Sequence, residues 1–471
     1  MESNKKRNIV VMVLCLVCFC AGVSVPVLYS NLASTKADSK TEKIKKILEK
    51  DWYYADQVED LDTLLNEQAI HGMTTLEIDP HTNYFDLEQA KAFSSSLQGT
   101  NKGIGIQFYK QSDGNLFVRY VFVNSAADKA GLKTGDVITK VGTLACANKE
   151  SDEIIQYIKD HSDKSISVDY VRDERAFTMD LIPSEYDATV ICQLHEGYGE
   201  IILNSFSAHS GQDVAVAMAR LKKAGISKMI LDLRNNTGGY LSAAIEIAST
   251  FLPKDSIVFY EEDKDGNVKE IKTDDSFGQI SMDQIIVLQN GNTASASEAL
   301  IGALKAELKD RVILVGDTTY GKGTEQTSVP FADGTSLKYT IARWLTPDKE
   351  WINEKGFVPD VPVKDTSIGS TSYIKMEKKD VIIADTAHEN AAAMQQFLQY
   401  LGYDVDRVDA YFSKHNSDVL KQFQKEHHLA PTGNCDYKTW DILLEKALEK
   451  YNQNSVSEDV VRNKAIELIK G

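Results

Sequence analysis

The sequence is poor in cysteine, and its cysteines follow no metal-binding or disulfide pattern. Six cysteines occur in 471 residues, and three of them lie within the first thirty residues, at Cys15, Cys18 and Cys20. The others are far apart in the sequence: Cys146, Cys192 and Cys435. This spacing argues against a disulfide-stapled fold and against cysteine-based metal sites. We therefore expect no metal and no other cofactor.

Positive charge is also scarce. Lys and Arg number 52 against 69 Asp and Glu, which gives a formal net charge of −17 at pH 7. A surface that binds phosphates needs clustered Lys and Arg, so we expect no nucleic-acid partner. The length of 471 residues exceeds what one hydrophobic core supports, and two to four domains are expected.

A long apolar run is found near the N-terminus. Basic residues at 5–7 precede an uncharged apolar stretch from residue 9 to about residue 29. About 20 such residues suffice to cross a bilayer as a helix. Because basic flanks stay on the cytoplasmic side, residues 1–30 are predicted to be a cytoplasmic stub and transmembrane anchor, with the rest of the chain outside the cytoplasm. A cleaved signal peptide is the alternative, although its apolar core is usually shorter, at roughly 7–15 residues.

The apolar pattern then predicts a helical region followed by a compact α/β module. Residues 31–98 carry apolar side chains three and four positions apart, as in Ile44, Ile47 and Leu48, which favours helices. The stretch DPHTNYF at 79–85 interrupts them with a turn. Residues 99–183 contain short runs rich in β-branched and aromatic residues and one amphipathic helix, so a small module of strands is expected.

Residues 184–370 alternate strand and helix patterns. The runs KMILDL and IIVLQN are continuously apolar, which is typical of strands buried on both faces of a parallel sheet. The predicted class is therefore multidomain α/β, with this domain as the core. A linker is expected at 371–388.

Three loops follow strands of this core and should meet at one edge of the sheet. They are DLRNNTGG (232–239), NGNTASASEALIG (290–302) and DTTYGKGTEQ (317–326). In open α/β sheets, sites form at the carboxyl ends of the strands. A serine at a strand-to-helix turn lies where backbone N–H groups and the helix dipole favour negative charge. Taken alone, TASAS favours a plain Ser N-cap on a well-packed helix over a catalytic serine.

No His-Asp pattern lies near these serines, so a different group must accept the proton. Lys322 stands between two glycines in the third loop. A lysine with apolar neighbours and little water loses its charge more easily than one in solution. A neutral Lys322 could then take the serine proton directly, without a histidine.

Two short modules resemble known binding domains. KGIGIQF followed by AGLKTGDVI resembles a PDZ domain, which implies that the turn at Gly103, Ile104 and Gly105 offers N–H groups to a peptide's terminal carboxylate. Residues 389–448 resemble the small helical peptidoglycan-binding module. They depart from it at Asp409–Phe412, and at His428, where glycine is usual. A helical cap that binds nothing is the alternative, and residues 449–471 are predicted to be a charged tail.

Residues of about 40–368, including DPHTNYF and the closing WLTPDKEWINEKGFVPDVPV, resemble the C-terminal processing (tail-specific) serine peptidases. The resemblance implies a nucleophile, a general base, a group that orients the base, an oxyanion hole and a supporting carboxylate. The resemblance makes Ser295 the nucleophile, Lys322 the general base and Gln326 the group that orients the base. It also implies that the N–H groups of Ala296 and of Gly238 or Gly239 form the oxyanion hole, and that Glu298 is the supporting carboxylate. Thr237 departs from the family's usual proline in the NNPGG loop.

Together these observations predict a membrane-anchored, extracytoplasmic Ser-Lys-Gln endopeptidase that cleaves near the C-termini of proteins, with access gated by the PDZ-like module. Expected partners are protein substrates with exposed C-termini, peptidoglycan, the membrane and a second copy of the chain. The main alternative is a catalytically silent scaffold of PDZ and wall-binding modules. A peptidoglycan hydrolase would need a metal cluster or paired catalytic carboxylates, and neither is evident.

Overall fold

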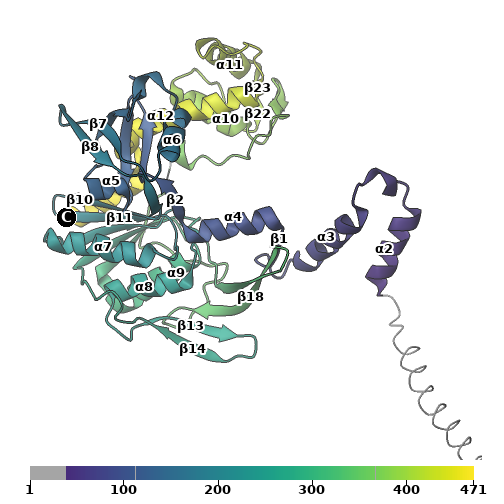
Figure 1. Cartoon of the computed structure of the whole chain (residues 1–471), viewed down its shortest axis with the longest axis horizontal. Coiled ribbons are helices and arrows are strands. Elements are labelled where there is room, and N and C mark those ends of the chain that lie inside the picture. Colours follow the sequence, from purple (N-terminus) through teal and green to yellow (C-terminus); the bar gives the residue numbers. More distant parts are fainter. Residues whose placement is uncertain (1–38, 112, 366–367) are drawn as a thin grey trace, which may run out of the picture. The chain divides into compact units, whose positions relative to one another are not determined.

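The computed structural model describes residues 39–111, 113–365 and 368–471 (Figure 1). They fall into two compact units. The first comprises the described part of Met1–Leu87 together with Thr327–Thr340, and the second comprises Glu88–Gln326 together with Ile341–Gly471.

The first unit consists of helices and a short sheet ladder. Its elements are α2 (Lys40–Asp51), α3 (Leu61–Thr74) and β1 (Asn83–Phe85). Strand β1 pairs antiparallel with the start of β18 (Ser336–Leu345). Both helices begin at a capping residue, because Ser39 and Asp60 accept hydrogen bonds from N–H groups of the first turns. Before β1, the Asp79 carboxylate accepts hydrogen bonds from the Thr82 and Thr340 hydroxyls. The predicted turn at DPHTNYF is fixed in this way.

The second unit begins with a helix, an antiparallel sheet and one long helix that packs on it. The elements are α4 (Leu87–Gln98), β2 (Thr100–Gly103), β3 (Ile106–Lys110), β4 (Leu116–Val121), α5 (Ala126–Ala130), β5 (Val137–Val141), β6 (Leu144–Ala145), α6 (Ser151–Asp160), β7 (Ile166–Arg172), β8 (Arg175–Leu181) and β9 (Ser184–Asp187). The sheet has the order β3-β4-β5-β7-β8, so β3 lies at an edge. A capping box between Glu150 and Glu153 starts α6, and Ile154 and Ile158 of that helix enter the module's core.

The core of the unit is a six-stranded sheet in the order β10-β11-β12-β15-β16-β19. All neighbouring strands pair in parallel except β10 and β11. Its elements are β10 (Val190–His195), β11 (Tyr198–Leu203), α7 (Ser210–Lys223), β12 (Lys228–Asp232), α8 (Leu241–Phe251), β15 (Gln284–Gln289), α9 (Ala296–Leu308), β16 (Val312–Gly316) and β19 (Val361–Pro362). A second sheet joins β18 to further strands: β13 (Ile257–Asp263), β14 (Val268–Lys272) and β17 (Thr324–Pro330).

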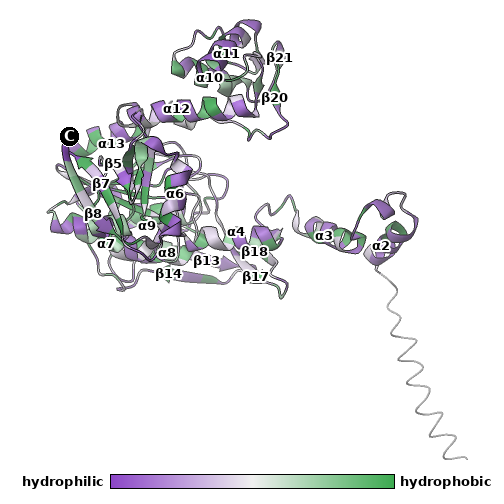
Figure 2. Ribbon diagram, turned by 45° about the horizontal axis from the view of Figure 1, so that its top comes forward, coloured by the Kyte–Doolittle hydropathy of each residue, from purple (hydrophilic) through white to green (hydrophobic). Residues whose placement is uncertain are grey.

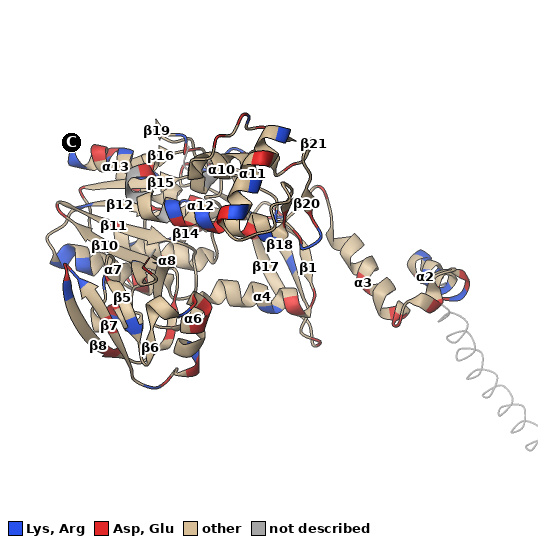
Figure 3. Cartoon of the chain, turned by 90° about the horizontal axis from the view of Figure 1, so that it is seen from above, with Lys and Arg blue, Asp and Glu red and all other residues tan. Residues whose placement is uncertain are grey.

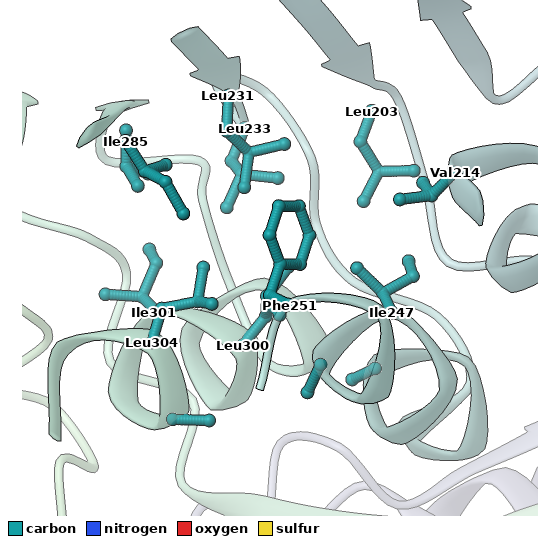
Figure 4. Close-up of a cluster of buried hydrophobic side chains, with 14 of the residues drawn as sticks. Leu203, Val214, Leu231, Leu233, Ile247, Phe251, Ile285, Leu300, Ile301 and Leu304 are labelled. Atoms are coloured by element: carbon teal, nitrogen blue, oxygen red, sulfur yellow. The ribbon is translucent and has the colours of Figure 1, made fainter. Parts of the chain in front are cut away.

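The six-stranded sheet is buried on both faces because its strands carry apolar residues at successive positions. Met229 and Leu231 of β12 pack in the cluster with α7, α8 and α9, whereas Ile230 between them belongs to the cluster on the other face. Figure 4 shows Leu231 pointing towards the helices, where Phe251 of α8 lies. The other face packs on the last helix of the chain, α13 (Val460–Lys470).

The C-terminal module has its own apolar core. Its elements are β20 (Val381–Ile382), β21 (Thr386–Ala387), α10 (Ala391–Leu401), β22 (Tyr411–Phe412), α11 (Lys414–Glu426), β23 (Cys435–Asp436) and α12 (Tyr437–Glu458). Phe397, Phe412, Phe423 and Trp440 pack together inside it. His428, which stands where glycine is usual, has a φ of 57°, so this turn keeps the left-handed conformation that glycine adopts most easily.

The segment 449–471 differs from the charged tail expected from its composition. It forms the end of α12 and all of α13, and Val461, Ala465 and Ile469 are buried. These residues recur every four positions, which is a helical stripe among charged neighbours.

The predicted membrane anchor is not supported. No helix in residues 39–111, 113–365 and 368–471 is long and apolar enough to cross a bilayer. The longest of these helices, α12, has 22 residues, but Figure 2 shows hydrophilic residues along its length. This finding contradicts the transmembrane part of the predicted fold class and the predicted single-pass localisation, while the multidomain α/β architecture stands. The stretch 9–29 on which those predictions rested lies outside the described residues.

Candidate active site

Ser295 occupies a strained turn between β15 and α9. It is the N-cap residue of α9, with φ 59° and ψ −116°, a conformation that residues other than glycine rarely adopt. The loop before it is held in place, because Thr293 Oγ1 donates to the Leu233 carbonyl at 2.9 Å and the Ala294 N–H donates to the Asn236 carbonyl at 3.0 Å. The 232–239 loop therefore supports the serine turn directly.

The two glycines of the 232–239 loop have different surroundings. A Cβ on Gly238 would lie 2.9 Å from Ser295 Cβ and 3.0 Å from Ala296 N, so this position has no room for a side chain. The Gly238 N–H donates to Asn236 Oδ1 at 2.9 Å. Within the described chain, the N–H groups of Gly239 and Ala296 have no acceptor. Of the two glycines between which the sequence did not choose, Gly238 has its N–H bonded within the loop.

Ser297 has a structural contact of its own. It is fully buried, and its hydroxyl donates to the Asn236 carbonyl at 2.9 Å. That carbonyl also accepts the bond from Ala294, so Ser297 helps to fasten the 232–239 loop to the start of α9.

The Glu298 carboxylate joins the serine turn to the lysine turn. Its Oε2 accepts hydrogen bonds from the backbone N–H of Ser295 at 2.8 Å and of Lys322 at 2.9 Å. Its Oε1 accepts from the Thr319 hydroxyl at 2.6 Å and from the Gly321 N–H at 2.7 Å. A carboxylate has about four lone-pair sites, so these donors use its full capacity. A single buried side chain in the first turn of α9 thus fixes the backbone of both predicted catalytic residues.

Lys322 lies in a tight turn against two tryptophans. Its carbonyl accepts a hydrogen bond from Trp344 Nε1 at 3.1 Å, and the Gly323 carbonyl accepts one from Trp351 Nε1 at 2.9 Å. Lys322 is half-buried and Trp344 is fully buried. Sequence reasoning assigned no role to either tryptophan, and the only signal was their place in the WLTPDKEWINEKGFVPDVPV stretch. They keep the lysine turn in shape by holding its carbonyls.

The remaining predicted residues lie further from the serine turn along the chain. Gln326 is half-buried on β17, and its Nε2 donates to Thr324 Oγ1 at 2.9 Å. Gly103, Ile104 and Gly105 lie in the separate module that contains β3, where they form the turn between β2 and that strand.

The turn at residues 103–105 is fixed by its carbonyl groups. Ile104 O accepts a hydrogen bond from the Ala127 N–H at 2.8 Å, and Gly105 O accepts one from the Phe122 N–H at 3.0 Å. Gly105 has φ 80°, and a Cβ there would lie 2.1 Å from the Cβ of Ser125. Only glycine fits this position.

No group of three or more His, Cys, Asp or Glu side chains in the described part of the chain could hold a metal ion. The turn that carries Ser295 and the turn that carries Lys322 are joined through the Glu298 carboxylate, and a serine, a lysine and N–H donors are groups suited to acyl transfer.

Comparison with known proteins identifies the family of the chain. The family model for peptidase family S41 matches residues 197–363, that for PDZ domains matches 103–182, and that for peptidoglycan-binding domains matches 387–443. The chain is 33% identical over 452 residues to the carboxy-terminal processing protease CtpA of Bacillus subtilis (strain 168), with 94% of this chain and 93% of the relative covered. The chain belongs to peptidase family S41.

This S41 peptidase is also similar to a second curated protease and to solved structures. It is 32% identical over 434 residues to the carboxy-terminal processing protease CtpB of the same organism, with 89% of this chain and 88% of the relative covered. Among solved structures, the photosystem II D1 C-terminal processing protease is 23% identical, with 70% of this chain and 93% of that chain covered and a TM-score of 0.38. The predicted family and enzyme class are confirmed: the S41 peptidase is a serine-type C-terminal processing peptidase that acts on protein substrates.

Replacing Glu298 by glutamine is expected to lower both stability and turnover. One carboxylate oxygen of Glu298 would be replaced by the glutamine NH₂ group, which cannot accept hydrogen bonds. The buried N–H and O–H groups that now donate to that oxygen would be left unsatisfied, which lowers the free energy of unfolding by about 1–3 kcal/mol. The backbone of Lys322 would shift relative to Ser295, and a displacement of about 1 Å lowers turnover about 10²-fold. Thermal melting measures the change in stability, and kcat with an unfolded protein as the substrate measures the change in turnover. Glu307→Gln, at an exposed position of the same helix, is the control; an unchanged kcat in Glu298→Gln would contradict the role given to this carboxylate.

Proposed function

We propose that Ser295 is the nucleophile of this peptidase and that Lys322, in its neutral form, is the general base. The observation that carries the proposal is the Glu298 carboxylate, whose Oε2 accepts hydrogen bonds from the backbone N–H groups of both residues. A pair that must exchange a proton needs a fixed separation, and a shared buried acceptor provides one. The serine's place at the N-terminus of α9 also favours the negative charge that develops there.

The proposed reaction has two stages. Lys322 takes the proton from Ser295 Oγ as that oxygen attacks a peptide carbonyl carbon, which forms a tetrahedral intermediate. The protonated lysine then gives its proton to the leaving amine as the peptide bond breaks and the acyl-enzyme remains. A water molecule then attacks the ester carbonyl and gives a proton to the neutral lysine. As the bond between the acyl carbon and Ser295 Oγ breaks, the lysine returns that proton to Oγ, which releases the acid and restores Ser295.

The oxyanion of the intermediate is proposed to bind the N–H groups of Ala296 and Gly239. Both donors lack an acceptor in the described chain, whereas the Gly238 N–H is occupied by Asn236. The peptide group that contains the Gly239 N–H is held through its Gly238 carbonyl, which accepts a hydrogen bond from the Phe206 N–H at 2.9 Å. Donors fixed before the reaction need no reorganisation when charge develops.

Gln326 is proposed to orient the lysine. It lies four residues beyond Lys322 at the start of β17, and its bond to Thr324 Oγ1 holds its amide on that strand. An amide can accept a hydrogen bond from the lysine in either protonation state.

The proposed substrates are proteins with accessible C-termini. The turn at Gly103–Gly105 leads into β3, and β3 is the edge strand of its sheet. An extended peptide can add to such an edge, with its terminal carboxylate on the N–H groups of the turn. The C-terminal module is proposed to bind peptidoglycan and so to localise the peptidase.

Covalent labelling tests the assignment of the nucleophile. A fluorophosphonate, which reacts with activated serines, is expected to modify Ser295 of the full-length protein, and fragmentation of the labelled peptide distinguishes it from Ser297. Label on Ser297, or at a position outside α9, would overturn the proposal. Heat-unfolded protein, which should not be labelled, controls for chemical reactivity alone.

A further inference from the structure

The last helix of the chain belongs to the peptidase core. Val461, Ala465 and Ile469 of α13 are buried against β12, β15 and β16, on the sheet face opposite α7, α8 and α9. Figure 3 shows α13 beside these strands, with several positions of the helix coloured as Lys, Arg, Asp or Glu. The core of the catalytic domain is therefore completed by a helix that follows the C-terminal module in the sequence.

A buried ion pair holds the first turn of α13 to the sheet. Arg462 donates to Glu200 of β11 through Nε at 2.7 Å and Nη2 at 2.6 Å, and His195 Nε2 lies 3.1 Å from Glu200 Oε2. Burial raises the pKa of Glu200, but the bonds with Arg462 and His195 outweigh this effect and lower the pKa to about 2. The carboxylate is therefore charged at neutral pH, and the ion pair is present there.

A second ion pair connects α13 to the 232–239 loop. Arg234 donates to Asp459 through Nη1 at 2.7 Å and Nη2 at 2.8 Å, and to Asp232 through Nε at 2.9 Å and Nη2 at 2.6 Å. Asp459 is the N-cap residue of α13, where its Oδ1 also accepts from the Arg462 N–H at 2.9 Å. The side chains of Arg234 and Asp459 are 16% and 14% exposed, so water screens this pair only weakly.

The residues after Arg234 lead directly to the proposed oxyanion hole. Asn235 and Asn290 exchange two hydrogen bonds, from Asn235 N to Asn290 Oδ1 at 3.0 Å and from Asn290 Nδ2 to Asn235 Oδ1 at 2.9 Å. The next residue, Asn236, accepts the bonds from Ala294 and Ser297 described above. A shift of Arg234 would therefore be passed to Gly239 on one side and to the serine turn on the other.

We propose that Asp459 is a positioning residue which, through Arg234, holds the 235–239 loop in the geometry that the oxyanion hole requires. The inference rests on the proposed role of the Gly239 N–H. The bidentate contact suits this purpose, because the guanidinium fork fixes the direction of the side chain as well as its distance. The C-terminal helix thereby contributes to the reaction rate and not only to the stability of the fold.

Two substitutions separate positioning from stability. In Asp459→Asn the new residue caps helices as well as aspartate does, but it offers one oxygen and no charge to Arg234. Arg462→Gln instead breaks the ion pair with Glu200, which lies away from the 232–239 loop. The full-length variants are compared for kcat and KM on fluorescently labelled casein and for melting temperature. Loss of a whole oxyanion donor costs about 10²–10³ in kcat, so Asp459→Asn, in which a donor is displaced, is expected to lose about tenfold in kcat with KM unchanged.

The control and a double variant complete the test. Arg462→Gln is expected to melt at a lower temperature and to keep the wild-type kcat. Arg234→Lys keeps the charge without the fork, and adding Asp459→Asn to it should lower kcat no further, because both changes break one contact. A wild-type kcat in Asp459→Asn, an equal loss in Arg462→Gln, or independent effects in the double variant would overturn the inference. Ser295→Ala is assayed alongside, and cleavage by that variant would refute the proposed function instead.

Discussion

Lys322→Ala is expected to lower kcat on casein by about 10²–10⁴-fold, the range that a positioned general base contributes. The variant should fold normally, because Glu298 binds the backbone N–H of residue 322 and the tryptophans bind the turn's carbonyls. None of these contacts involves the lysine side chain. Steady-state kinetics and thermal melting measure the two quantities.

Lys322→Arg distinguishes a base from a positive charge at this position. Arginine stays protonated in proteins and cannot accept the serine proton, so this variant is expected to be as inactive as the alanine variant. Lys355→Ala, at an exposed lysine in the turn that faces Gly321, is the matched control and should retain wild-type kcat. Substantial cleavage by Lys322→Arg would show that the lysine acts through its charge, and the assignment of the base would then be wrong.

Ser295→Ala is expected to abolish cleavage, with a loss in kcat of about 10⁴–10⁶-fold as for other serine peptidases without their nucleophile. Alanine at this position must adopt the same φ of 59°, and the Glu298 bond to its N–H does not depend on the hydroxyl. The fold should therefore be kept.

Ser297→Ala provides the comparison within the same turn. It loses only the bond to the Asn236 carbonyl, so we expect slower but readily measured cleavage. Equal inactivity of the two variants, at equal stability, would contradict the choice between the serines. The double variant Ser295→Ala/Lys322→Ala should be no slower than Ser295→Ala, because the two residues act as one unit.

Much of this site follows from local pattern and sheet topology. The apolar runs KMILDL and IIVLQN predict buried strands of a parallel sheet, and the structure shows that β12 and β15 are parallel and also neighbours. The carboxyl ends of such strands meet at one edge, so the glycine loop and the serine turn had to lie close together. The proposed choice of Gly239 over Gly238 could not be made from the sequence, because it depends on a bond from the Gly238 N–H to Asn236 Oδ1 within the folded loop.

Other features depend on contacts between distant segments. The four donors to Glu298 come from residues up to 24 positions away, and the sequence shows only a glutamate in the first turn of a helix. The tail at 449–471 was expected to be solvated because of its charge, and the stripe of Val461, Ala465 and Ile469 was the missed signal. Ion pairs with Glu200 and Arg234 allow such a charged helix to pack on the core.

The pH dependence of Ser295 labelling tests the central claim most directly. The rate of fluorophosphonate labelling is followed from about pH 5 to about pH 10 in the wild type and in Lys322→Ala. Only the neutral amine accepts a proton, so the wild-type rate should rise with pH to a plateau, with an apparent pKa below the ~10.4 of a free lysine. The rise should be absent in Lys322→Ala. The same rise in both proteins, or a wild-type midpoint at the value of a free amine, would contradict a neutral Lys322 as the base.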